Sequence, residues 1–316
     1  MLNFILKRIL SLIPVLFVVS VVVFLLVHIT PGDPASVMLG PEASPQEVAK
    51  LQEELGLNRP ILEQYVTWVG DIFKGDLGTS LFMKQPVLTA FLEHLGPTFS
   101  LAIMAQLFAI VLAIPLGVLS AKFRGSILDQ TFMGISLVGI SVPSFLLGLF
   151  LILLFGVELR WLPVAGYKPL EAGLDVHIRY LILPAIALGS MQAALIARMT
   201  RSSMLDVLSA NFIKTARAKG VKEFIITMKH SLRNAFIPIL TIIGQTFGTL
   251  VAGAAVVETV FNIPGIGQLI INSVERRDFE VIQGVVLLIA VSYVTINLVI
   301  DLLYGIVDPR LRVGKR

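Results

Sequence analysis

The chain has 316 residues, of which 56% are hydrophobic and 15% are charged, and its formal net charge is +4. Soluble domains carry about 25% charged residues. This chain therefore has too few polar side chains to cover a soluble surface, and we expect a membrane protein. Cysteine is absent, which excludes disulfides and thiolate metal sites. The four histidines have no paired ligand spacing, so we expect no metal site.

Six apolar stretches are long enough to cross a bilayer, and backbone exposed to lipid must be helical in such segments. The first follows Lys7 and Arg8 as a signal-peptide core would. It is too long for such a core, however, and no A-x-A cleavage site follows, so we expect a retained transmembrane helix. The fourth is the least apolar because it contains Pro184 and Gln192. We expect an all-α membrane protein with transmembrane helices at 9–29, 98–121, 131–156, 180–198, 236–260 and 281–305.

The distribution of charge predicts the orientation of these six helices. One set of connecting segments holds sixteen of the 25 Lys and Arg residues but only five of the 21 acids. Cytoplasmic loops carry such an excess of cations, so we expect both termini in the cytoplasm. The sixteen cations are Lys7, Arg8, Lys122, Arg124, Arg198, Arg201, Lys214, Arg217, Lys219, Lys222, Lys229, Arg233, Arg310, Arg312, Lys315 and Arg316; the five acids are Asp129, Asp206, Glu223, Asp301 and Asp308.

On the opposite side, residues 31–97 predict a small helical lobe packed on the membrane domain. Ser44, Pro45 and Glu47 have the spacing of a capping box with proline at the first helical position. A second helix is expected from Pro60 to Gly75, with one apolar stripe. The stripe consists of Ile61, Tyr65, Trp68 and Ile72.

The segment 199–235 is a second long connection and lies on the cytoplasmic side in this topology. It is basic, and Gly220 separates a strongly helical first half from a second half that is helical and amphipathic. The apolar ridge expected on the second half consists of Ile225, Met228 and Leu232. Three interpretations are open. The cations can act as a topology signal that contacts lipid headgroups, the loop can bind nucleic acid, or it can dock into a groove of a soluble partner. The lack of interleaved aromatic residues disfavours nucleic acid, and we expect docking.

Catalytic groupings are absent from the sequence. There is no P-loop, no G-x-S-x-G motif and no carboxylate pair within a span, which disfavours an intramembrane enzyme. Glu258 and Asp301 lie near span ends, whereas a proton-coupled carrier would place a carboxylate nearer the middle of the membrane. Polar uncharged residues within the spans either bond helix to helix or line a translocation path. Our pore-lining candidates are Gln106, Ser141, Gln245 and Thr246.

Four stretches together resemble a known family. TARAKG at 215–220 with KHSLRNAFIPIL at 229–240 resembles the cytoplasmic EAA loop of bacterial ABC-importer permeases of the dipeptide, oligopeptide, glutathione and nickel class. The other stretches are PGDP at 31–34, GISVPSFLLGLFLILLFGVELRWLP at 139–163 and VVETVFNIPGIGQLIINSVERRDFEVIQG at 256–284. The similarity runs nearly end to end and is greatest to the B-type permease of the glutathione branch. The loop departs from the general EAA pattern, because Lys214 stands at its opening acid and Arg233 at its closing proline.

The resemblance implies a type I ABC-importer permease architecture in the bacterial cytoplasmic (inner) membrane. It implies a second homologous permease, two cytoplasmic ATPases that bind ATP and Mg, an extracytoplasmic substrate-binding protein, and surrounding lipid, with no nucleic-acid partner. The chain itself would be a transport subunit without cofactor or enzymatic activity. The ATPase-docking residues would be Thr215, Ala216, Arg217, Ala218, Lys219, Gly220 and Val221; those facing the binding protein would be Pro264, Gly265, Gly267, Arg276, Arg277 and Asp278.

The same resemblance predicts the function: transport of short peptides or peptide-like solutes such as glutathione. A nickel-chelate permease is the alternative within the class. A stand-alone carrier is disfavoured because the sequence shows neither a charge at mid-membrane nor an inverted repeat. The segment PGIG at 264–267 is either a plain turn or a re-entrant segment that lines the external mouth.

Overall fold

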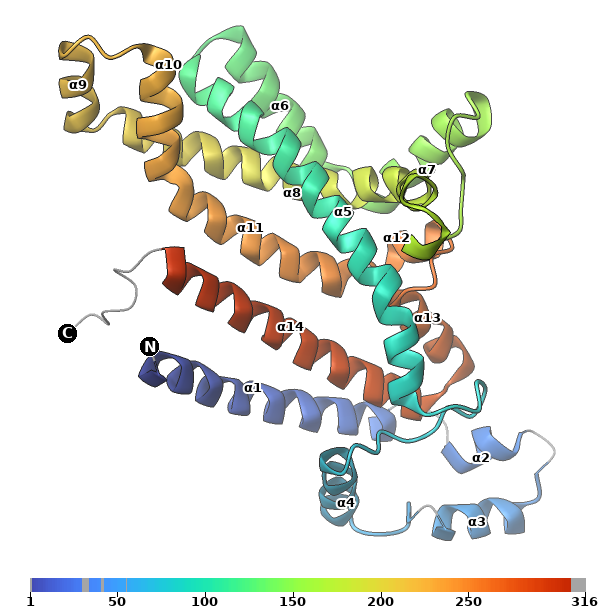
Figure 1. Cartoon of the computed structure of the whole chain (residues 1–316). Helices are drawn as coiled ribbons and strands as arrows, with labels where there is room; N and C mark the ends of the chain where they lie inside the picture. Colours follow the sequence, from blue (N-terminus) through green and yellow to red (C-terminus); the bar gives the residue numbers. More distant parts are fainter. Residues whose placement is uncertain (1, 30–33, 41–42, 55, 308–316) are drawn as a thin grey trace. The chain divides into compact units, whose positions relative to one another are not determined.

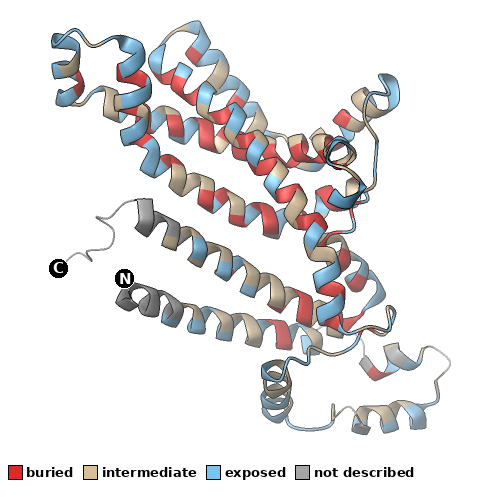
Figure 2. Ribbon diagram, in the orientation of Figure 1, coloured by how far each residue is buried: buried red, intermediate tan, exposed pale blue. Residues whose placement is uncertain are grey.

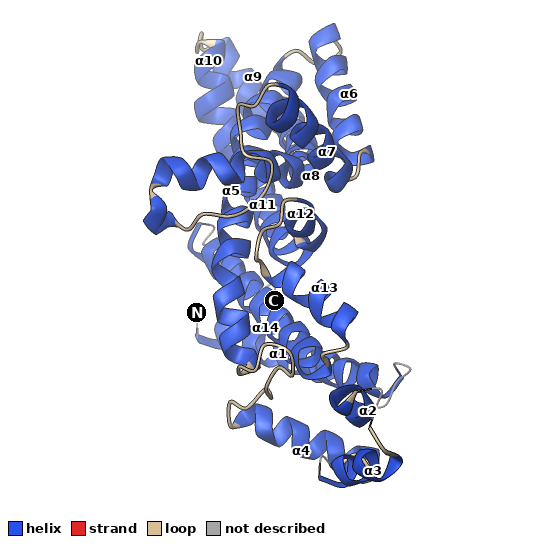
Figure 3. Ribbon diagram, turned by 90° about the vertical axis from the view of Figure 1, so that its right-hand side faces the viewer, coloured by secondary structure: helices blue, strands red, loops and turns tan. Residues whose placement is uncertain are grey.

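The computed structural model describes residues 2–29, 34–40, 43–54 and 56–307, and this part of the chain consists of helices and loops without a strand (Figure 3). Pro31, Gly32 and Asp33 of the PGDP motif lie outside it, as do Asp308 and the basic tail residues Arg310, Arg312, Lys315 and Arg316. The chain forms two compact units, which are described separately. Unit 1 comprises Met1–Gly96 and Gln268–Leu298, and unit 2 comprises Pro97–Gly267 and Val299–Arg316.

Unit 1 contains two long apolar helices and the lobe predicted between the first two spans (Figure 1). Ser44 and Glu47 form the predicted capping box, since each main-chain N–H bonds the other residue's side chain. Tyr65 and Trp68 pack their rings on Phe24, at centroid distances of 5.3 and 5.7 Å. The elements of this unit are α1 (Leu2–Ile29), α2 (Pro34–Leu39), α3 (Pro45–Glu54), α4 (Ile61–Phe73), the start of α5 (Val87–Lys122), most of α13 (Ile266–Arg276) and most of α14 (Phe279–Val307).

Unit 2 is built around α8, which carries the densest run of buried residues (Figure 2). Helices α6, α7 and α11 pack against it. Small residues let α5 approach as well: a Cβ on Gly189 would lie 2.5 Å from the Ala105 carbonyl oxygen. The elements of this unit are the rest of α5, α6 (Ile127–Ser141), α7 (Ser144–Leu151), a π-helical segment (Ile152–Glu158), a 3-10 helix (Leu170–Ala172), α8 (Leu174–Leu208), α9 (Asn211–Ala218), α10 (Glu223–Ile225), a second π-helical segment (Ile226–Leu232), α11 (Arg233–Gly253), α12 (Ala255–Val260), the first residues of α13 and the last residues of α14.

Five helices in the described residues are long and apolar enough to cross a membrane, and a bent pair raises the number to six. The expected continuous helix over 131–156 is broken, because Ile127–Ser141 and Ser144–Glu158 meet at an angle of 101°. Pro143 is the physical cause. Proline disfavours helical geometry in the preceding residue, and Val142 adopts the extended conformation. The other five lie at Leu12–Ile29, Val87–Lys122, Leu174–Leu208, Glu223–Val251 and Phe279–Ile300.

The helices that flank the basic connection extend further into it than the sequence suggested. Helix α8 continues to Leu208, ten residues past the expected end of the fourth span, and Glu223–Val251 is a single helical stretch. The second amphipathic half is therefore the start of the next long helix and not a separate element. Only α9 and the turn after it stand apart, as a short projection between two long helices.

Candidate functional site

The turn after α9 depends on Gly220. Its φ is +75°, and a Cβ there would meet nothing within 4 Å. Glycine is thus required for its backbone conformation and not for space. The turn closes with hydrogen bonds from Gly220 N to the Arg217 carbonyl and from Val221 N to the Ala216 carbonyl, at 2.9 and 3.1 Å. Ile213 is fully buried and anchors α9 on unit 2.

An ion pair spans this turn, from the last turn of α9 to the first residue of α10. The Arg217 guanidinium donates to both carboxylate oxygens of Glu223, at 2.7 and 3.4 Å. The hydrogen bond with Glu223 raises the pKa of Arg217 above its ordinary value, so this side chain stays charged. Both partners are about half exposed, and such surface pairs contribute at most about 1 kcal/mol. The pair therefore connects the two ends of the turn but adds little to the stability of the fold.

The projection and the start of the long helix that follows it present cations beside exposed apolar side chains. Phe212, Phe224 and Met228 are 48%, 73% and 44% exposed. The predicted ridge is partly confirmed, because Ile225 and Met228 are exposed whereas Leu232 is half-buried. Of the predicted docking residues, Ala216 and Val221 are half-buried; Thr215, Arg217, Ala218, Lys219 and Gly220 are exposed. An apolar ridge with a basic rim suits the groove of a soluble partner.

The four pore-lining candidates separate into two kinds. Gln106 and Thr246 are buried and bonded to each other across α5 and α11, with 3.3 Å between Gln106 Nε2 and Thr246 Oγ1. Gln245 is exposed on α11. Ser141 is exposed at the end of α6, where its hydroxyl donates to the Leu137 carbonyl oxygen. The first pair has the geometry of helix-to-helix bonding, and the second pair faces outward from this chain.

The PGIG turn is held by a network that the sequence did not reveal. The Thr98 hydroxyl donates to Glu258 Oε1 at 2.6 Å and accepts from Ile266 N at 2.8 Å. Ile263 N donates to the Glu258 carbonyl oxygen at 2.8 Å. Glu258 is fully buried, and a Cβ on Gly265 would overlap its carboxylate. Sequence reasoning singled out Glu258 only as an acid near a span end, since nothing local connects it to Thr98.

The residues predicted to face a binding protein differ in exposure. Pro264 is exposed and Gly265 is buried. Gly267 is half-buried, and a Cβ there would overlap the backbone of Ala255. In unit 1, Arg276 and Arg277 are exposed, whereas Asp278 is buried and accepts a hydrogen bond from Ser80 Oγ at 2.6 Å. In unit 2, the less exposed Gly265 and Gly267 therefore support the exposed Pro264. In unit 1, the buried Asp278 supports the exposed Arg276 and Arg277.

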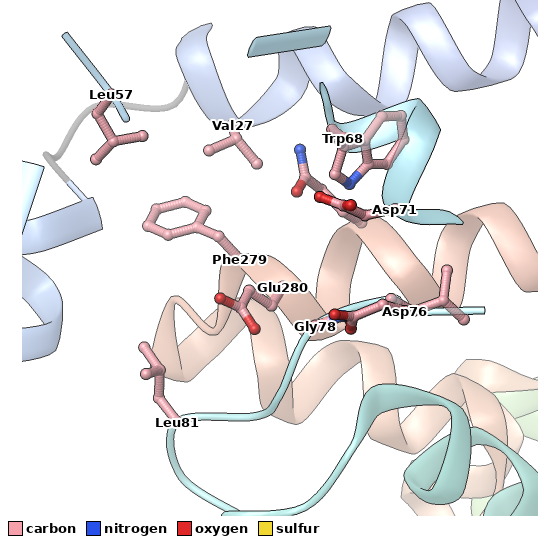
Figure 4. A pocket seen from close by; sticks show the side chains of 11 residues that line it. Val27, Leu57, Trp68, Asp71, Asp76, Gly78, Leu81, Phe279 and Glu280 are labelled. Atoms are coloured by element: carbon pink, nitrogen blue, oxygen red, sulfur yellow. The ribbon is translucent and has the colours of Figure 1, made fainter. Parts of the chain in front are cut away.

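Unit 1 also contains a half-open pocket of about 250 Å³ between α1, α4 and the start of α14 (Figure 4). Its lining combines Trp68 and Phe279 with the carboxylates of Asp71, Asp76 and Glu280. The carboxylates have structural partners: Asp71 pairs with Lys74, Asp76 accepts from Gly78 N, and Glu280 accepts from Thr79 N. The described residues hold no group of three or more His, Cys, Asp or Glu suited to a metal ion.

Two family models match the chain and together cover almost all of it. Residues 113–313 match the binding-protein-dependent transport system inner membrane component. Residues 1–102 match the N-terminal membrane component of the same transport systems. The match includes the basic projection, the bent pair and the PGIG turn.

Curated relatives are similar over almost their whole length. A probable peptide ABC transporter permease protein, y4tP of Sinorhizobium fredii, is 43% identical over 309 residues, which are 98% of this chain and 99% of the relative. The glutathione transport system permease protein GsiC of Escherichia coli K12 is 43% identical over 312 residues, 99% of each. An inward-facing structure of the MetNI methionine ABC transporter superposes with a TM-score of 0.57 at 21% identity, covering 70% of this chain and 97% of that one.

Proposed function

The chain belongs to the binding-protein-dependent transport system inner membrane components and is a permease subunit of an ABC importer, and we propose that it carries a short peptide or a peptide-like solute such as glutathione. Two relatives named for peptide and glutathione transport, each covered almost end to end, support this substrate class. We further propose that the chain pairs with a second homologous permease. Two cytoplasmic ATPases would bind ATP and Mg, and an extracytoplasmic binding protein would deliver the solute.

The observation that carries the coupling role is the basic projection on a buried base. Thr215, Arg217 and Lys219 are exposed on α9 and the turn after it, whereas Ile213 and Ile226 beneath them are fully buried. A partner that pushes on this projection moves α8 and α11, because the segment between them is short. We assign Thr215 through Val221 to the ATPase cleft. Hydrolysis is then the partner's chemistry, and this chain needs no cofactor.

The decisive experiment reconstitutes the permease pair, ATPases and binding protein in liposomes and measures ATP-dependent uptake. Labelled dipeptide, glutathione and a nickel chelate would be offered separately. Uptake of dipeptide or glutathione supports the proposal, while uptake of the chelate alone supports a nickel-class permease. Uptake by this chain without ATPases would show a stand-alone carrier. We expect the chain alone to hydrolyse no ATP.

Substitution of Gly220 tests the coupling element directly. Gly220→Val forces a β-branched residue into φ +75°, a conformation that costs an ordinary residue about 1–2 kcal/mol, so the projection should change shape. We expect insertion and expression to persist while ATP-driven uptake falls at least about tenfold, as a 1.4 kcal/mol change implies. Gly75→Val is the matched control, since φ there is +87° with nothing nearby. Equal uptake by the two variants contradicts the role.

The proposed topology places the projection and both termini in the cytoplasm. The chain has no cysteine, so a single Ala218→Cys substitution introduces a unique probe at an exposed position of α9. We expect a membrane-impermeant maleimide to label it in inside-out vesicles only. Labelling in intact cells would show that the projection faces the outside and would overturn the proposed orientation. Thr67→Cys on the exposed face of α4 is the complementary control and should label from outside.

A further inference from the structure

One buried carboxylate ties the turn between α5 and α6 to α8. Asp129 is 3% exposed and accepts four hydrogen bonds. Arg201 on α8 donates two of them, from Nε at 2.7 Å and from Nη2 at 2.8 Å, in bidentate geometry. Ser120 Oγ on α5 and Gly125 N in the turn donate the others, at 2.5 and 2.9 Å. Two helices and one turn therefore converge on a single side chain at the start of α6.

Packing around this carboxylate is close enough for the elements to move together. A Cβ on Gly117 of α5 would lie 2.6 Å from Thr200 Cβ on α8. Val118 and Ala121 of α5 form a buried cluster with Met204 of α8. Well-packed interiors of this kind transmit displacement instead of absorbing it. The Asp129–Arg201 pair adds a directional bond to this contact, because a bidentate guanidinium resists rotation as well as separation.

The pair lies on the path to the basic projection. From Arg201, α8 continues without interruption to Leu208, and α9 starts at Asn211. A displacement of α9 therefore reaches Arg201 through one rigid helix. The α5–α6 turn has no such covalent route, since about ninety residues separate it from α9 along the chain.

We infer that Asp129 and Arg201 are positioning residues that make the α5–α6 turn follow the projection, so that the ATPase stroke moves α5, α6 and α8 as one body. This inference rests on the proposed function. If the pair had only a structural role, its loss would affect only folding and assembly. If the pair couples the α5–α6 turn to the projection, its loss would also lower the ratio of solute transported to ATP hydrolysed.

The test uses the assembled importer in liposomes and measures uptake and ATP hydrolysis together. Arg201→Lys keeps the charge but loses the bidentate contact. We expect it to assemble and hydrolyse ATP without solute as the wild type does, while solute moved per ATP falls at least about fivefold, the lower end of typical coupling between sites. Arg198→Lys, one turn earlier on α8 and exposed, should match the wild type.

The reciprocal exchange Asp129→Arg with Arg201→Asp should recover part of the ratio that either single change loses. An Arg201→Lys importer with the wild-type ratio would overturn the inference. An Arg201→Lys importer that fails to assemble would also overturn it. The same holds if uptake and ATP hydrolysis fall together and the reciprocal double variant recovers neither. Failure of the proposed function is separate, since the wild-type importer itself would then show no ATP-driven uptake.

Discussion

Two polar clusters in unit 2 join distant segments by different means. Around Asp129, a buried carboxylate meets a guanidinium, a hydroxyl and a backbone amide. Around Thr98, a neutral hydroxyl bridges the Glu258 carboxylate and the backbone of Ile266, and glycine fills the remaining space. The first cluster ties helices beside the basic projection, and the second holds the PGIG turn.

The two clusters tolerate different kinds of substitution. A bidentate ion pair is directional as well as charged, and it fails when one charge is removed or when the bidentate geometry is lost. The Thr98 hydroxyl bridge and the tightly packed glycines of the PGIG turn make only short-range contacts. This cluster therefore fails when a larger side chain replaces a glycine or when the hydroxyl is removed. The ion pair suits helices that must move together, and the hydroxyl bridge suits a turn that must stay closely packed.

The largest effect is expected from Asp129→Asn. The amide keeps the size of the side chain but leaves the Arg201 guanidinium, 27% exposed, without its counter-charge. Breaking a buried pair on one side costs about 3 kcal/mol at the lower end of measured values. Thermal or denaturant unfolding in mild detergent would measure the loss. A change below 1 kcal/mol would mean that solvent compensates the charge and would remove the contrast between the clusters.

The contrast also shows what the sequence could and could not predict. Apolar runs, the capping box at Ser44 and the break at Gly220 follow from local chemistry, and the structure contains all three. The bend before Pro143 had a local signal as well, but the apolar run through it predicted a continuous helix. The Asp129–Arg201 and Thr98–Glu258 contacts join residues 72 and 160 positions apart. Nothing in composition or periodicity pairs such distant residues.

Gly267→Ala should have the next largest effect and tests the tightness of the PGIG turn. The new Cβ would lie 2.3 Å from Ala255 Cα, which is backbone and cannot swing aside. Overpacking of this kind costs about 2 kcal/mol. Gly253→Ala is the control, because a Cβ there meets nothing within 4 Å at the end of α11. Unfolding midpoints of both variants in one detergent give the comparison, and equal midpoints would show that the turn can move away.

Thr98→Val tests the hydroxyl bridge without changing volume. The valine removes the donor to Glu258 and the acceptor for Ile266 N, and a lost buried partner costs about 1.5 kcal/mol. Thr98→Ser keeps the hydroxyl and should retain most of the stability. If the serine variant were as unstable as the valine variant, packing of the methyl group and not hydrogen bonding would hold this turn.

Gln106→Leu should have the smallest effect and decides between the two interpretations of the buried polar pair. Gln106 bonds Thr246 and the Ile243 carbonyl at 3.3 and 3.4 Å, both long contacts, and interhelical hydrogen bonds in membranes average about 0.6 kcal/mol. If the pair only joins α5 to α11, unfolding shifts by that amount and ATP-driven uptake stays at the wild-type level. Gln245→Leu on the exposed face of α11 is the partner experiment, and there uptake should fall if that side chain lines the path. A loss of uptake in Gln106→Leu with unchanged stability would instead move the translocation path to the α5 side, because a hydrogen bond this weak cannot account for it.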